Sequence, residues 1–319
     1  MYYDNNVNLK DALMDQYSKY LGVSVIPTYR CNFRCKTCCE TLTNDPIRVE
    51  QILKLEDLEA FIKFLIKVNE TLSVDEAKFN WILLTGGEVT TLPFEYIKEV
   101  CNLTHKYGFR TSMATNGSKG KELLELDGFL DRIVMSHHWK TPVAPDWVSD
   151  FKTTKILVSK LIDKRSFPNR ESFEQFVEEI INCPKTLNYR LKFITYGRYT
   201  PGFDDVHPLW VDNDFPETAE FFTTPARKAN YKGFEVRFTH FNPTEKDINN
   251  KIAEKPHTWI MHPNGNVNTH WGSDEFKLDY RTSEDYKSIK AEMRKMSSNF
   301  AKTQSETYGL DPTNVKVIL

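Results

Sequence analysis

The residues Cys31-Asn32-Phe33-Arg34-Cys35-Lys36-Thr37-Cys38 place three thiols within eight positions, with three residues between the first pair and two between the second. The apolar segment before them, Val23–Tyr29, predicts a short buried strand at about 22–28. A strand that ends in closely spaced cysteines is typical of a metal site at the end of a sheet. Three thiolates leave a four-coordinate iron or zinc site one ligand short, and the open position is where chemistry can occur.

The composition is that of an ordinary globular protein. With 319 residues, 40% hydrophobic and 13% aromatic, the chain can form one large α/β domain with an appendage. A formal net charge of −2 gives no general argument for nucleic-acid binding, and a local basic groove stays open.

The cysteines indicate a reducing compartment. Four of the six lie within residues 31–39, which is not the layout of a secreted disulfide framework; the other two are Cys101 and Cys183. The first residues are polar and lack a secretory signal pattern, and no apolar run approaches membrane-spanning length. We therefore expect a cytoplasmic protein with no membrane partner.

Strand and helix patterns alternate after the cysteine segment. They predict helices at Leu55–Val68, Phe94–Tyr107, Lys119–Leu130 and Glu171–Asn182, and strands at Phe79–Leu84, Phe109–Ala114, Arg132–Ser136, Thr154–Leu161 and Leu191–Tyr196. Alternation of this kind implies parallel pairing through right-handed crossovers. Six such units predict an α/β fold, a partial (β/α)6 TIM-like barrel rather than the full eightfold one.

The rest of the chain has a different character. We expect residues 1–20 to be a leader, 21–197 the barrel and 198–319 an α+β extension that caps it. Prolines break regular structure over Arg198–Asn230, Phe234–Phe238 alternates like a strand, and Ser283–Phe300 predicts a late helix. Asn264-Gly265 between two strand-like runs indicates a hairpin over Trp259–Trp271.

Polar motifs follow three of the predicted strands. Thr85-Gly86-Gly87-Glu88 ends the second strand, Thr115-Asn116-Gly117 ends the third, and Ser136 ends the fourth. Each has an ordinary structural explanation, since Gly-Gly-Glu is a common turn and Asn-Gly favours a left-handed one. At the carboxyl ends of parallel strands, the same residues are also placed to meet a ligand.

The cysteine spacing after a first strand, with Gly-Gly-Glu about 50 residues later, resembles the radical S-adenosylmethionine (radical SAM) superfamily over roughly residues 20–197. The resemblance implies that Cys31, Cys35 and Cys38 bind a 4Fe–4S cluster whose fourth iron is chelated by S-adenosylmethionine. It also implies that Gly86, Gly87 and Glu88 bind the methionine amino group, and that Thr115, Asn116 and Ser136 lie near the bound cofactor. The resemblance assigns no role to Cys39, and His137 and His138, at the mouth of the expected barrel, stay open as candidates of which one would enter the site.

Two departures from the family pattern limit this reading. The residue before the third cysteine is usually aromatic but is Thr37 here, so Tyr29 or Phe33 is left to contact adenine. The Trp259–Trp271 hairpin weakly resembles the SPASM/twitch extension of peptide-modifying relatives, yet no cysteine follows Cys183, and we expect one cluster per chain.

The resemblance implies reductive cleavage of S-adenosylmethionine to a 5′-deoxyadenosyl radical that abstracts hydrogen from a substrate. A flavodoxin-type reductase is the implied electron donor. The hairpin favours a peptide or peptide-derived substrate, and a nucleoside or nucleotide is the alternative. A non-catalytic iron–sulfur or zinc-binding protein is the third possibility.

Overall fold

The structure of the chain is a computed structural model. It describes residues 20–35, 46–71, 78–137, 146–162, 169–182, 188–195, 219–220, 226–231, 234–240, 259–268 and 278–281. The predicted late helix at Ser283–Phe300 lies outside the described residues, and so does the predicted leader at 1–20 except for Tyr20.

The described strands form one sheet in the order β11-β10-β1-β2-β3-β4-β5-β6-β9-β8-β7. Their bounds are β1 Tyr20–Val25, β2 Lys78–Leu84, β3 Arg110–Thr115, β4 Arg132–His137, β5 Lys155–Ile162, β6 Asn188–Thr195, β7 Ala219–Glu220, β8 Ala226–Tyr231, β9 Phe234–His240, β10 Ile260–Met261 and β11 Val267–Asn268. Pairing is parallel from β10 through β1–β6 to β9, and antiparallel for β11, β8 and β7. The sheet is therefore mostly parallel, as the strand–helix alternation predicted.

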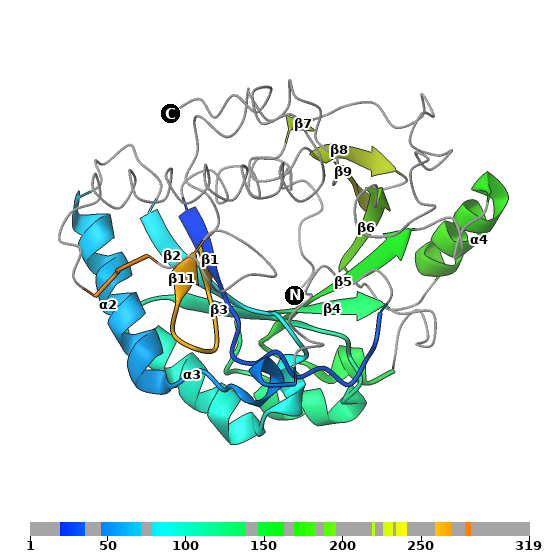
Figure 1. The fold of residues 1–319 in the computed structure, drawn as a ribbon. Coiled ribbons are helices and arrows are strands. Elements are labelled where there is room, and N and C mark those ends of the chain that lie inside the picture. The colour runs from blue at the N-terminus through cyan, green and yellow to red at the C-terminus, as the bar shows by residue number, and fades with distance from the viewer. Residues whose placement is uncertain are drawn as a thin grey trace.

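The sheet curves, and helices lie against its outer side (Figure 1). These helices are α2 Leu55–Thr71, α3 Phe94–Lys106 and α4 Arg170–Ile181. Apolar residues at helical spacing on α2, including Leu58, Phe61 and Leu65, are fully buried in one core with β1–β5. Burial of this stripe is what holds α2 on the sheet, and it leaves the opposite face of the strands free to carry polar groups.

The outer face of β4 and β5 continues this core up to the strand ends. His137 is buried with its ring 5.8 Å from that of Phe176 on α4, and Lys160 Nζ lies 5.7 Å from the same ring centroid. Because side chains alternate along a strand, Ser136 and its neighbour in register, Ser159, occupy the inner face. His137 thus belongs to the helix-covered side.

Three sequence predictions are corrected. The segment predicted to be helical at Lys119–Leu130 forms only a 3₁₀ stretch at Gly120–Leu126, because Gly120 and Gly128 adopt left-handed backbone angles at either end. The segment Arg198–Asn230, expected to be irregular, contributes β7 and most of β8. The expected six parallel strands are extended by β9 and β10, whose partners are distant in sequence.

The hairpin prediction is confirmed within its described part. β10 and β11 pair antiparallel around a turn in which Gly265 has φ 79°. β10 also pairs parallel with β1, so the hairpin extends the sheet beside the strand that precedes the cysteines (Figure 1). No helix within the described ranges is long and apolar enough to cross a membrane.

Candidate functional site

The cysteine loop begins at Cys31, and the segment Ile26–Arg30 connects it to the carboxyl end of β1. Cys31 is partly exposed and Cys35 is exposed, and neither forms a disulfide. Cys38 and Cys39 lie outside the described residues, and within the described ones no three metal-ligating side chains gather. Two accessible thiols in one loop are nonetheless a donor set that suits iron–sulfur ligation. The part of the predicted ligand set that is described therefore fits a cluster.

The Gly-Gly-Glu turn packs against the segment that leads into this loop. The amides of Gly87 and Glu88 donate to the carbonyls of Thr28 and Arg30, at 3.2 and 2.7 Å. A Cβ on Gly86, where φ is 107°, would lie 2.3 Å from Ile26 Cγ2, and one on Gly87 would lie 2.2 Å from the Arg30 oxygen. Gly86 is required by its left-handed backbone angle and by the Ile26 side chain, and Gly87 by the close approach of the Tyr29–Arg30 backbone, whatever ligand the site holds.

The carboxylate of Glu88 is buried and ties together the ends of β2 and β3. Oε1 accepts hydrogen bonds from the amide and hydroxyl of Thr90, at 3.1 and 2.6 Å, and from the Thr115 hydroxyl at 2.7 Å. Oε2 accepts from the Asn116 amide at 2.6 Å. Four donors occupy most of what a carboxylate can accept. Of its two oxygens, Oε2 retains more capacity for a further donor, such as an ammonium group.

Asn32, inside the cysteine loop, connects the loop to the end of β3. Its Oδ1 accepts from Asn116 Nδ2, and its Nδ2 donates to Ser118 Oγ, both at 2.8 Å. Asn116 Oδ1 in turn accepts from the Ser118 amide at 2.9 Å. The Thr115-Asn116-Gly117 turn therefore holds the loop and Glu88 at the same time.

The cationic neighbours of the cysteines have protein partners. Arg30 Nη2 lies 2.6 Å from Glu50 Oε2, and its Nε donates to the Val49 carbonyl at 3.0 Å. Arg34 Nη1 donates to the carbonyls of Cys31 and Phe33, at 2.9 and 3.3 Å. These contacts shape the loop, and they keep two positive charges close to the thiols.

The remaining predicted residues separate into two groups. Ser136 is partly buried and shares the inner-face register with Ser159 at the strand ends, beside the motif residues. Tyr29, in contrast, is completely buried, with its hydroxyl hydrogen-bonded to His262. Of the two aromatic residues considered for adenine, only Phe33 has exposed surface.

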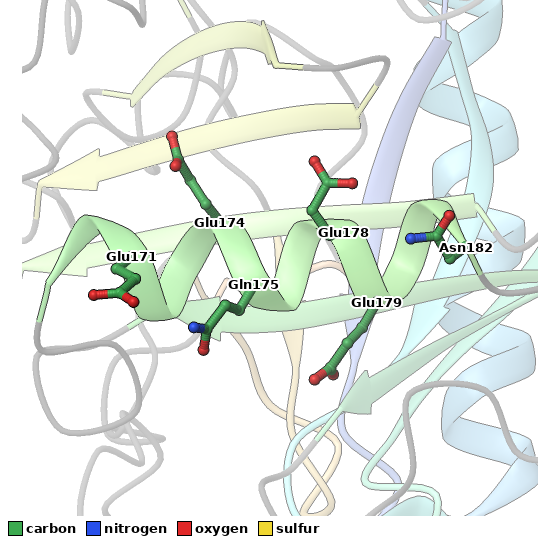
Figure 2. Close-up of a pocket in the computed structure, with 6 residues that line it drawn as sticks. All are labelled: Glu171, Glu174, Gln175, Glu178, Glu179 and Asn182. Carbon is green, nitrogen blue, oxygen red and sulfur yellow. The ribbon is translucent and has the colours of Figure 1, made fainter.

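A shallow hollow lies elsewhere, along the outer side of α4. It is bordered by Glu171, Glu174, Gln175, Glu178, Glu179 and Asn182, whose side chains splay apart along the helix (Figure 2). Among the residues that the structure describes, no cysteine or strand-end motif residue borders it. The hollow is therefore separate from the candidate site.

Comparisons with known proteins support the fold. No protein-family model matches the sequence, and no curated protein matches it significantly. A solved structure described as native anSMEcpe with bound AdoMet matches with a TM-score of 0.53 and 12% identity, covering 88% of this chain and 84% of that one. The two chains share a fold. At this identity the likeness carries no residue roles across.

Sequence reasoning missed several residues that build the site. Asn32 lies between the cysteines, and its amide, which can both donate and accept hydrogen bonds, could have been predicted to hold the loop. Thr90 gave no signal, because its bond to Glu88 depends on the local turn. His262 was recognised only as part of a hairpin, since its partner Tyr29 is 233 positions away.

Proposed function

We propose that this chain is a radical SAM enzyme with one 4Fe–4S cluster, built on a partial (β/α)6 barrel and capped by residues 198–319. The observation that carries the proposal is the cysteine loop itself. Two cysteines of the three-cysteine motif, neither of them in a disulfide, follow the carboxyl end of the first parallel strand, and the Gly-Gly-Glu and Thr-Asn-Gly turns hold their loop there. The fold shared with an AdoMet-bound protein supports it.

In this proposal Cys31, Cys35 and Cys38 hold the cluster, and the strand ends hold S-adenosylmethionine. The bound pair would supply reductive carbon–sulfur cleavage and a 5′-deoxyadenosyl radical able to take hydrogen from an unactivated C–H bond. Gly86, Gly87 and Glu88 would bind the amino group, with Oε2 of Glu88 as the acceptor. Thr115, Asn116 and Ser136 would line the cofactor's remaining edge.

The protein's own contribution is to position and to exclude water. Glu88 is buried and bonded to Thr115 and the Asn116 amide, so the ends of β2 and β3 cannot separate without leaving donors unpaired. Asn32 then transmits that fixed position to the cysteine loop. The site is thereby preorganised before any cofactor arrives.

The substrate we favour is a peptide or peptide-derived molecule, because a hairpin extends the sheet beside the cysteine loop. A nucleoside or nucleotide is the alternative. A flavodoxin-type reductase would deliver the electron, and the cytoplasm would provide the reducing conditions.

A non-catalytic iron–sulfur or zinc protein is the second candidate. The Glu88 network favours it, because four protein donors already occupy most of the acceptor capacity of that carboxylate without a ligand. This candidate predicts a bound metal and no cleavage of S-adenosylmethionine.

Anaerobic reconstitution tests the proposal. The chain is loaded with iron and sulfide, reduced with dithionite, and incubated with S-adenosylmethionine. We expect about four irons and four sulfides per chain, with 5′-deoxyadenosine released. A full cluster without 5′-deoxyadenosine would favour the second candidate, and a Cys35→Ala variant that keeps cluster and activity would refute the ligand assignment.

A further inference from the structure

Three buried polar side chains connect the cysteine loop to the C-terminal hairpin of residues 259–268. The Tyr29 hydroxyl lies 2.5 Å from His262 Nδ1, and His262 Nε2 lies 3.0 Å from Asn268 Oδ1. All three residues are at most 1% exposed. Tyr29 precedes the first cysteine by two positions. The hairpin therefore reaches the base of the predicted cluster loop through side chains alone.

The chemistry of the partners defines the direction of both hydrogen bonds. An amide oxygen only accepts, so the proton of a neutral imidazole lies on Nε2, which donates to Asn268. Nδ1 is then the acceptor for the Tyr29 hydroxyl. Each of these buried polar atoms thus has a partner of the right kind, and this arrangement avoids the cost of an unpaired group.

Backbone hydrogen bonds of the hairpin fix the position of His262 relative to β1. The amides of Ser24 and Ile26 donate to the carbonyls of Trp259 and Met261, at 2.8 and 2.7 Å. The His262 amide itself donates to the Asn266 carbonyl at 2.8 Å. The imidazole is consequently held in line with β1 and at its carboxyl end. It stands on the opposite side of β1 from the Gly-Gly-Glu turn.

The hydrogen bond between Tyr29 and His262 restricts the position of the hairpin relative to the cysteine loop more closely than an apolar contact would. Apolar packing tolerates small slides of one backbone past another, whereas an O–H···N bond weakens steeply with misalignment. Tyr29 carries the constraint, and the single residue between it and Cys31, Arg30, leaves the thiol little freedom. Such buried polar chains favour one arrangement among several compact ones.

We propose that the hairpin is a clamp that positions the cysteine loop, with His262 as a positioning residue acting through Tyr29. The inference rests on the proposed function for its purpose, since the loop is held in order to present Cys31 to a cluster. It gives a role to a hairpin that carries no cysteine and therefore offers no thiolate to a second cluster.

Two substitutions of His262 separate the two bonds. In His262→Asn the amide oxygen takes the place of Nδ1 and still accepts from Tyr29. In His262→Gln the amide nitrogen takes the place of Nε2 and still donates to Asn268. Tyr29→Phe removes the hydroxyl and keeps the ring. Tyr107→Phe is the matched control, because its hydroxyl bonds Glu59 between α3 and α2, away from the loop.

The first measurement needs no cluster. Thiol alkylation of the metal-free protein is followed by mass spectrometry at Cys31 and at Cys101, which is fully buried and reports global opening. We expect alkylation of Cys31 to accelerate about fivefold or more in Tyr29→Phe and His262→Gln, the factor that follows from losing one buried hydrogen bond. His262→Asn and Tyr107→Phe should match the wild type, and Cys101 should react equally slowly in all five proteins.

The second measurement uses the reconstituted protein. Loss of the cluster to an iron chelator should accelerate by a similar factor in Tyr29→Phe and His262→Gln and should be restored in His262→Asn. Equal rates in all variants, or parallel acceleration of Cys31 and Cys101, would overturn the clamp. Failure of the wild type to cleave S-adenosylmethionine would instead remove the proposed function, and the alkylation result would stand by itself.

Discussion

The cysteine loop is held from two sides, and the two sides are built differently. Toward β2 and β3, backbone amides of the Gly-Gly-Glu turn and the side chains of Asn116 and Ser118 reach it, from segments at most 86 positions away. Toward β10, a single line of side chains reaches Tyr29 from His262, 233 positions away. On the first side several contacts come from residues of recognisable sequence motifs. On the second side the loop depends on one contact between residues much farther apart in sequence. A site of this kind can thus carry recognisable motifs and still need an anchor that no motif reveals.

The largest effect should come from the motif side. Gly87→Ala places a Cβ 2.2 Å from the Arg30 oxygen, and backbone at that point cannot move without displacing the loop. We expect a loss of about 3 kcal/mol in the free energy of unfolding, measured by urea denaturation. Gly22→Ala is the control, because its Cβ would have only ordinary contacts at 3.6 Å and beyond. Equal stabilities for the two variants would mean that the close approach does not matter.

A smaller effect is expected from Glu88→Gln. The substitution turns one acceptor oxygen into an NH₂ group facing a backbone amide, and weakens hydrogen bonds that a charge had strengthened. We expect a loss of about 2 kcal/mol. Glu122→Gln, which disturbs only an exposed pair with Lys119, should change stability by less than about 0.5 kcal/mol. If both variants unfold alike, Glu88 is not the link between β2 and β3.

A smaller loss of stability is expected when the turn of the hairpin, far from the cysteine loop, loses a hydrogen bond. The Tyr280 hydroxyl donates to the Gly265 carbonyl at 3.2 Å, and burial raises the pKa of this phenol to about 12, although Arg281 opposes the shift. Tyr280→Phe should cost about 1 kcal/mol in thermal unfolding and leave Cys31 alkylation unchanged. Acceleration at Cys31 would show that the whole hairpin, and not the His262 line alone, sets the loop position.

The smallest change in stability is expected at Asp127, which belongs to neither of the two sides that hold the cysteine loop. Burial would raise the pKa of this carboxyl, but hydrogen bonds from the backbone of Lys152, Thr154 and Thr153 outweigh it and hold the pKa well below its usual range. A lowered folded-state pKa stabilises the protein above the unfolded value of about 3.9 and loses that stabilisation as pH falls.

Asp127→Asn should therefore be less stable than the wild type at pH 7, by less than Tyr280→Phe. The difference in melting temperature between the wild type and Asp127→Asn should shrink as pH falls below about 4. A difference that stays constant between pH 7 and pH 3 would mean that the lowered pKa does not contribute. Alkylation of Cys31 should be the same in both proteins, which separates this site from the two anchors.

Much of the fold was predictable because its patterns are local. The apolar stripe of α2 and the short apolar run of β2 both read correctly, within a few residues at each end. The stretch at 120–126 did not, because two glycines with left-handed angles override a sequence of helix-forming residues. β7 and β8 were missed in a proline-containing segment, where the pairing of β7 with β8 and of β8 with β9 supplies what local propensity lacks.

The sequence by itself determined the thiols, the glycines and the polar turns at the strand ends, because each is required by local geometry or by the chemistry of a ligand. Only the tertiary structure decided how they are joined. It placed His137 toward α4, committed Glu88 to four protein donors, and brought His262 to Tyr29. Such contacts depend on which face a strand presents and which distant strand pairs beside it. A periodic pattern along one segment carries no information about either.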